Sequence, residues 1–442
     1  MRILGPIVIA GLLVGVVPAE AGQFNAESFT LANGLQVVVV PSHRTPAIAQ
    51  MVWYKAGAAD EAPGKSGIAH FVEHLMFRGS KAMPPGAFSR TIAENGGRDN
   101  AFTTEDYTAY YQTVASDRLE LVMRLEAERM HDLLITEEQV KTEREVIIEE
   151  RRTRIDNVPG SLLAEQIDAV LFLNSHYRLP TIGWQHEMRG LGADDARSFY
   201  QTWYAPNNAV VVISGDVTVE RVRELAEKYY GPVPAKPVPE HPALTEPPKV
   251  ASTRLEMTSP RAANPYWSRS YLAPTFIEQA GRPADVATVL AELLGGGETS
   301  RLYKRLVLDK KLATSVGADY SGERNAGSFS IYAEPREGVD IGALEVAVAA
   351  EVAVLLRDGA SADEVARVKR RLQEGAIYDR DSLMAPARII GASLASGRTL
   401  AEVEAWPDRI GTVTPEEILK LARDVITDST AVTAVLLPEK RS

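Results

Sequence analysis

The chain alternates short apolar segments with longer amphipathic ones, and the pattern repeats in its two halves. Residues 35–40 and 47–56 of the first half are rich in β-branched and aromatic residues, which predicts strands, and 268–272 is a comparable segment in the second half. Each half closes with a helical pattern followed by a β-branched strand: 195–203 with 209–214, and 415–425 with 431–437. Because the order lacks the regular βαβ rhythm of a parallel sheet, we predict a duplicated α+β unit.

Several predicted helices begin at capping boxes, in which Ser or Thr is followed three residues later by Glu or Gln. Such a pair satisfies two of the free N–H groups at a helix start. The pairs are Thr136 with Gln139, Ser361 with Glu364, and Thr414 with Glu417.

A proline-rich stretch separates the two halves. Residues 231–250 contain seven prolines, a density that disfavours helix and central strand and favours extended chain. A chain of 442 residues is also too long for one compact core. We therefore predict a first domain over 22–231, a linker over 232–250 and a homologous second domain over 251–442.

The first 21 residues have the pattern of a secretory signal peptide. Arg2 is followed by an apolar run over 3–17, and residues 19–21 (Ala-Glu-Ala) form a cleavage site. Because the run is short for a membrane span, we predict a cleaved signal over 1–21 and no stable membrane span. An uncleaved anchoring or amphipathic helix is the alternative. Export implies a periplasmic protein of a Gram-negative bacterium.

Charge and cysteine content narrow the function classes. A formal net charge of −11 argues against a nucleic-acid partner, which needs a basic face. The chain has no cysteine, so no thiolate can act as nucleophile or metal ligand. Any metal site must therefore use His and carboxylate groups, and the chain has only seven histidines.

Two of these histidines lie in a segment with the apolar periodicity of a buried helix, residues 67–77. His70 and His74 are four residues apart, so they share one face and could bind one Zn²⁺. Glu73 can reach the same pocket and could act as general base on a zinc-bound water. The alternative is two hydrogen-bonded core histidines without a metal.

A third zinc ligand is expected from the charged helical run 136–152, because catalytic zinc usually has three protein ligands. Glu143 and Glu150 are seven residues apart and share a face, whereas Glu145 and Glu149 point elsewhere. Most carboxylates of this run are expected to be solvated or paired with neighbouring basic residues.

The H-x-x-E-H order at 70–74 resembles the signature of the pitrilysin/insulinase family, the inverted zincins, which includes the mitochondrial processing peptidases. The resemblance implies one Zn²⁺ per chain, with Glu150 of an E-x6-E pair as third ligand and Glu143 orienting the site. It also implies two homologous domains, each an antiparallel sheet packed with helices. Asn100, Ala101 and Phe102 resemble the family's edge strand, to which a peptide substrate adds as an extra strand.

The second half departs from the family pattern. Active members carry an Arg and a Tyr seven residues apart that reach over the zinc, but the matching positions here hold Val307 and Thr314. We therefore expect the zinc-bearing subunit of a pair, whose homologous partner supplies the missing Arg and Tyr; the alternative is a homodimer. Alternatively, the function comes from a shifted position: Arg301, Tyr303, Arg305 or Tyr320.

The function implied by the resemblance is zinc-dependent endopeptidase, cleaving peptides or unfolded segments in a chamber between the domains. A non-catalytic zinc-binding assembly subunit is the second hypothesis. An unligated Glu73 beside the metal argues against it, because a structural zinc site usually closes its fourth position. A plain peptide-binding module, the third, would leave the ligands unexplained.

Overall fold

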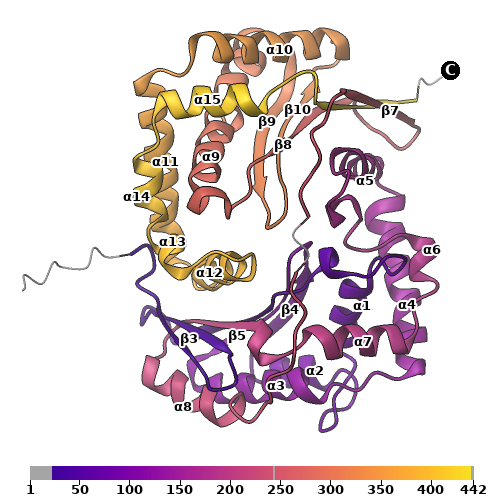
Figure 1. The fold of residues 1–442 in the computed structure, drawn as a ribbon, viewed down its shortest axis with the longest axis vertical. Helices are drawn as coiled ribbons and strands as arrows, with labels where there is room; N and C mark the ends of the chain where they lie inside the picture. Colours follow the sequence, from indigo (N-terminus) through magenta and orange to yellow (C-terminus); the bar gives the residue numbers. More distant parts are fainter. Residues whose placement is uncertain (1–21, 242–243, 440–442) are drawn as a thin grey trace, which may run out of the picture.

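The computed structural model describes residues 22–241 and 244–439, and the predicted signal peptide over 1–21 lies outside them. Each half of the chain forms one sheet with packed helices, and the two halves lie one above the other (Figure 1). The predicted α+β class is confirmed.

The first sheet has six strands in the order β1-β2-β6-β3-β5-β4. Their bounds are β1 (Glu27–Thr30), β2 (Gln36–Pro41), β3 (Ala47–Tyr54), β4 (Arg98–Thr103), β5 (Thr108–Ala115) and β6 (Ala209–Gly215). Neighbouring strands are antiparallel except β2 and β6, which are parallel. Since β6 is inserted between β2 and the oppositely directed β3, it must run parallel to one of them.

The second sheet repeats this topology with five strands in the order β7-β11-β8-β10-β9. They are β7 (Thr253–Ser259), β8 (Tyr266–Ala273), β9 (Ala313–Gly322), β10 (Gly327–Pro335) and β11 (Val432–Pro438). Again one pair, β11 with β7, is parallel, because the last strand returns between two earlier ones. The predicted antiparallel sheets thus each contain one parallel pair that the sequence pattern did not predict.

Helices cover both sheets. In the first half these are α1 (Ile68–Leu75), α2 (Ala87–Glu94), α3 (Leu119–Asp132), α4 (Glu137–Arg151), α5 (Pro159–Leu171), α6 (Gln185–Met188), α7 (Ala193–Trp203) and α8 (Val219–Tyr229). In the second half they are α9 (Arg282–Gly295), α10 (Ile341–Asp358), α11 (Ala362–Asp381), α12 (Ala385–Ala395), α13 (Leu400–Glu404), α14 (Trp406–Gly411) and α15 (Pro415–Val425). The three predicted capping boxes are present at α4, α11 and α15.

Each half sends one helix across to the other half's sheet (Figure 1). Ile390 of α12, from the second half, is buried in a cluster with Trp53 and Val212 of the first sheet. Leu163 of α5, from the first half, is buried against Leu436 of the second sheet. The two halves therefore share apolar cores, which fixes their relative position.

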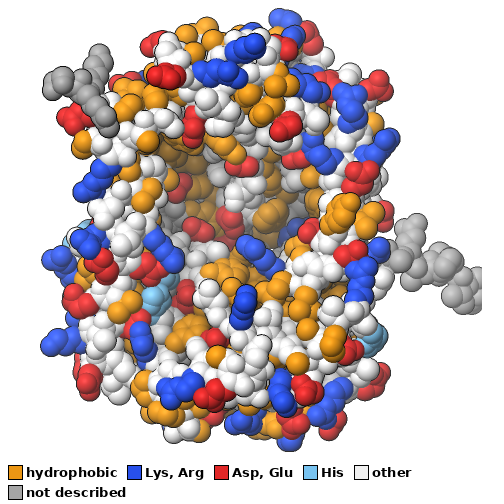
Figure 2. Space-filling view, turned by 180° about the vertical axis from the view of Figure 1, so that it is seen from behind, with side chains coloured by type: hydrophobic (Ala, Val, Ile, Leu, Met, Phe, Trp, Pro, Cys, Tyr) orange, Lys and Arg blue, Asp and Glu red, His pale blue; other side chains and the backbone are white. Residues whose placement is uncertain are grey.

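Between the halves the molecular surface is hollowed, as Figure 2 shows. Described linker residues 232–241 and 244–250 form neither helix nor strand, in agreement with their proline content. Among the described residues, no helix combines the length and apolarity needed to cross a membrane.

Candidate metal centre

The start of α1, the helix that carries the two histidines, is fixed by its backbone conformation and its hydrogen bonds. Gly67 precedes it with φ +87°, and a Cβ there would lie 2.6 Å from the carbonyl oxygen of Ile182, so only glycine fits. The buried carboxylate of Glu61 accepts hydrogen bonds from the backbone N–H groups of Gly67 and Ala69, each at 2.9 Å. Glu61 therefore satisfies two free N–H groups at the start of α1.

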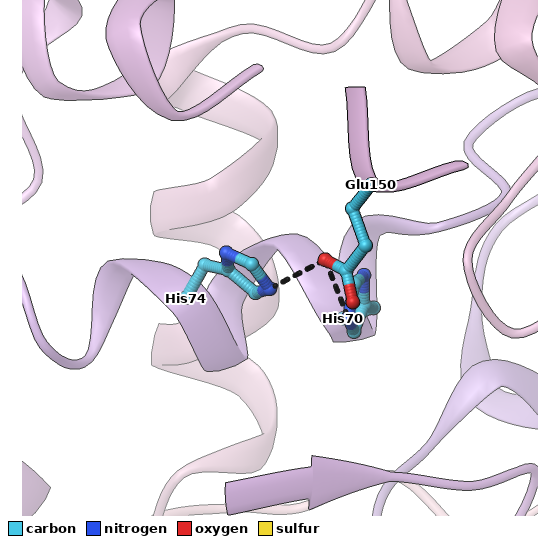
Figure 3. A group of neighbouring side chains, drawn as sticks. All are labelled: His70, His74 and Glu150. Atoms are coloured by element: carbon cyan, nitrogen blue, oxygen red, sulfur yellow. Dashed lines mark ion pairs between the residues drawn. The ribbon is translucent and has the colours of Figure 1, made fainter. Parts of the chain in front are cut away.

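His70 and His74 point from one face of α1 toward Glu150 of α4, as predicted (Figure 3). Nε2 of His74 lies 3.3 Å from Oε2 of Glu150, and Nε2 of His70 lies 3.9 Å from the same oxygen. Tetrahedral Zn²⁺ with ligands at about 2.0–2.1 Å separates its ligand atoms by roughly 3.3 Å. The donor types and spacing of the three side chains therefore fit zinc.

The burial of the apolar face of α4 determines where Glu143 and Glu150 lie. Val140 and Ile147 are buried, and Glu143 between them is buried on the same side. The side chain of Gln139, part of the capping box, also donates to the backbone oxygen of Arg78 at 2.7 Å, which fixes α4 against the end of α1. Glu150, seven residues after Glu143, thereby faces the histidines.

Glu143 supports the cluster without facing its centre. Its Oε1 lies 2.8 Å from Nδ1 of His74, and its Oε2 accepts from Nε of Arg78. Burial raises the pKa of Glu143, but the hydrogen bonds from His74 and Arg78 outweigh burial and lower it overall. A carboxylate that binds the ring nitrogen facing away from the metal fixes the orientation of the histidine ring. Zinc-binding histidines commonly have such a partner.

The two histidines differ electrostatically. Burial, with the neighbouring His74, lowers the pKa of His70, which favours the neutral ring that binds metal. Burial also opposes the charge on His74, but hydrogen bonds with Glu143 and Glu150 raise its pKa to about 9. A cation at the cluster would compete with that proton.

Glu73 lies beside the cluster on α1 and has a separate partner. It is 7% exposed, and its Oε2 accepts a hydrogen bond of 2.6 Å from the hydroxyl of Thr103, the last residue of β4. Burial raises the pKa of Glu73, and the Thr103 hydrogen bond acts in the opposite direction. A buried carboxylate with a raised pKa, fixed by one hydrogen bond, suits a general base.

β4 is the edge strand of the first sheet, and among the described residues β5 is its one strand partner. Asn100 is exposed, whereas Ala101 and Phe102 are half-buried, and the Phe102 ring packs edge-on against Trp53 at 5.6 Å. One side of β4 is therefore open for pairing with another extended chain.

The side chains of Val307 and Thr314 cannot replace the Arg and Tyr that the family pattern has at these two positions. Val307 is buried in the core of the second half, and Thr314 is exposed and donates to the backbone oxygen of Glu334. The shifted candidates have structural contacts: Arg301 with Glu364, Arg305 with Asp309, Tyr320 with the Pro274 carbonyl, and Tyr303 against the second core.

Sequence reasoning missed Glu61, Arg78 and Arg154, which support the cluster. Arg154 binds Oε1 of Glu150 at 2.7 Å, and its spacing of four residues could have indicated this pair. Arg78 lies four residues after His74, so the same rule places it near the site. Glu61 lies in the segment before α1, where no periodicity indicates a partner.

Two models of one peptidase family match the chain in succession. The first, "Insulinase (Peptidase family M16)", matches residues 36–184, and the second, "Peptidase M16 inactive domain", matches residues 190–372. The chain belongs to peptidase family M16. The resemblance predicted from the H-x-x-E-H segment is therefore confirmed.

M16 relatives of this chain include proteins named as zinc proteases. The zinc protease PqqE of Helicobacter pylori is 34% identical over 295 residues, 66% of this chain and 65% of that protein. A probable mitochondrial-processing peptidase subunit beta of Arabidopsis thaliana is 23% identical over 421 residues, 92% of this chain and 78% of that protein. The crystal structure of a protease from Helicobacter pylori has a TM-score of 0.87 at 27% identity, covering 93% of this chain and 99% of that one.

Proposed function

We propose that the chain is a zinc-dependent endopeptidase whose metal is held by His70, His74 and Glu150. The observation that carries this proposal is Glu73. It is buried beside three converging ligands, yet its hydrogen bond goes to Thr103 and it is not needed as a ligand. A site with a structural role gains little from such a group.

Different residues of the chain have different roles in peptide hydrolysis. Bound Zn²⁺ would supply a Lewis acid that polarises the scissile carbonyl and lowers the pKa of water. Glu73 takes the proton from the attacking water and passes it to the leaving amine. Glu143 keeps His74 oriented, and Thr103 keeps Glu73 in place. No covalent intermediate with the protein is needed.

Peptide substrates bind as an added strand along β4. The free edge of this strand ends at Thr103, whose hydroxyl contacts Glu73, so a paired peptide bond lies close to the proposed base. Asn100, Ala101 and Phe102 supply main-chain pairing that is independent of substrate sequence. We expect peptides and unfolded segments to enter through the hollow between the halves, which Figure 2 shows.

A partner subunit completes the site. Since Val307 and Thr314 replace the Arg and Tyr expected over the zinc, the oxyanion would lack a donor from this chain's second half. A homologous chain that carries the pair supplies it, whereas a second copy of this chain would bring the same Val307 and Thr314. The Arabidopsis relative is itself named as a subunit.

The protein acts outside the cytoplasm. The pattern of residues 1–21 supports a cleaved signal peptide and a periplasmic location, in which a peptidase without cysteines needs no reducing environment.

The test is peptide cleavage after metal exchange. The purified mature chain is stripped of metal, reconstituted with Zn²⁺ and given a quenched fluorescent peptide library, with and without copurifying M16 chains. Activity restored by Zn²⁺ supports the proposal, and activity only with the second chain supports the completed site. Stoichiometric zinc without cleavage in either case would favour the non-catalytic assembly subunit.

A further inference from the structure

We propose that Arg324, in the second half of the chain, is a positioning residue for the catalytic base. By binding Asp106 and Asp60 it fixes the turn after β4, and with it the Thr103 hydroxyl that holds Glu73. This inference rests on the proposed peptidase function.

Arg324 lies between β9 and β10, on the hairpin of the second half that points toward the first half (Figure 1). One guanidinium nitrogen lies 3.3 Å from Oδ1 of Asp60 and 3.6 Å from Oδ1 of Asp106. The backbone N–H of Arg324 also donates to Oδ2 of Asp106 at 2.8 Å. Both aspartate side chains are 0% exposed and that of Arg324 is 10% exposed, so this is a buried contact between the halves.

Tyr177 extends the same contact. Its hydroxyl donates to Oδ1 of Asp106 at 2.6 Å and accepts from the backbone N–H of Asn325 at 2.9 Å. Asp106 is therefore held by a side chain of its own half and by two groups of the hairpin. His241 of the linker also faces this cluster, with Nδ1 2.7 Å from Oδ1 of Asp60.

The two aspartates belong to segments that hold each other. Asp106 lies in the turn between Thr103 and β5, and the backbone oxygens of Thr104 and Glu105 accept hydrogen bonds from residues 58 and 59 at 3.0 and 2.8 Å. Asp60 ends that neighbouring segment and accepts from the N–H of Gly57. The guanidinium thus joins the turn to the segment that leads into α1.

The hairpin tip has apolar as well as polar contacts with the first half. Ala326 is buried with Ala59 and Tyr177, while a cavity of about 370 Å³ borders residues 324–326 on the side of linker residues 244–246, β8 and residues 275–278. Buried carboxylates without a cation are strongly unfavourable. Burial raises the pKa of Asp106, and the charge of Arg324 opposes that effect. Loss of the guanidinium would therefore leave both aspartates without the charge of Arg324 and weaken one of the contacts that hold the turn.

A short series of contacts connects Arg324 to Glu73, the proposed base. Arg324 holds Asp106, Asp106 belongs to the turn that starts after Thr103, and Thr103 donates to Glu73. Although Val307 and Thr314 stand where the family pattern has Arg and Tyr, the second half contacts the turn that follows β4 through Arg324.

A double-mutant cycle tests the inference in the full mature chain with its partner. Arg324→Ala should lower kcat about tenfold or more with KM nearly unchanged, because a misplaced catalytic group slows chemistry rather than binding. In a Thr103→Val background the same change should cost less than about threefold, since the two act through one contact. Arg324→Lys should recover part of kcat. Arg282→Ala is the control, because Arg282 also pairs with a carboxylate, but its hydrogen-bond partners, Arg409, Thr412 and Glu417, are all residues of the second half.

Hydrogen–deuterium exchange gives a readout that does not depend on activity. Arg324→Ala should speed exchange of amides 104–108, whereas Arg282→Ala should not. Unchanged exchange, or a kcat effect fully additive with Thr103→Val, overturns the inference. If Arg324→Ala does not fold, Asp106→Asn takes its place in the same cycle. Inactivity of the zinc-loaded wild type would refute the proposed function, and the inference with it, even where exchange at 104–108 responds.

Discussion

The Glu143→Gln substitution should weaken zinc binding without removing a ligand. In the wild type, Oε1 of Glu143 contacts Nδ1 of His74 at 2.8 Å and Oε2 accepts from Arg78. A glutamine can keep its oxygen toward His74, but its amide nitrogen would then face another donor, the Arg78 guanidinium. One hydrogen bond is retained, one is lost, and the negative charge behind the histidine disappears.

Loss of such an outer contact lowers zinc affinity about 10–100-fold. This corresponds to about 1.4–2.8 kcal/mol of binding free energy. The assay is competition for Zn²⁺ with a fluorescent chelator, supported by the melting temperature of the metal-free protein. Glu145→Gln is the control, since Glu145 lies on the same helix and is exposed. Zinc affinity of Glu143→Gln within about threefold of the wild type would refute the reasoning.

Three further changes test other parts of the structure. Thr103→Val removes the hydroxyl bonded to the proposed base and should lower kcat about tenfold with zinc content unchanged; steady-state kinetics with metal analysis checks this, and an unaltered kcat would contradict it. Ile390→Ala at the buried α12 contact should lower the free energy of unfolding in urea by about 2–5 kcal/mol, whereas Ile377→Ala, at a residue 54% exposed, should change it by less than about 0.5 kcal/mol. The hydrogen bond from Arg301 lowers the pKa of Glu364 from 4.5 to about 2. The ionised Glu364 therefore stabilises the folded protein above about pH 4.5, and this contribution is lost as the pH falls toward 2. The difference in melting temperature between wild type and Glu364→Gln should therefore shrink between about pH 6 and pH 3; a constant difference would contradict it.

The helices and strands could be predicted from local sequence patterns, because the residues that favour a helix or a strand lie within a few positions of one another. The capping box at Thr136 and the helix over 415–425 match the structure, as does the strand over 209–214 within one residue. Long-range pairing was not predictable. The insertion of β6 between two earlier strands and the exchange of α5 and α12 between halves depend on contacts over more than a hundred residues.

The same distinction applies to the site. His70 and His74 could be paired from their spacing, since four residues make one helical turn. The spacing alone left Glu143 and Glu150 of α4 as candidates, and the family resemblance favoured Glu150, which the structure brings to the histidines. Arg324 gave no sequence signal because its partners, Asp60 and Asp106, are more than 200 residues away.

The central claim is that Glu73 is the general base of a zinc peptidase. The most direct measurement compares kcat of the wild type and Glu73→Gln on the same quenched peptide, with zinc content measured in both. Retained zinc and KM with kcat lowered at least about 100-fold is the predicted result. Full zinc occupancy with more than a tenth of wild-type kcat would contradict the claim.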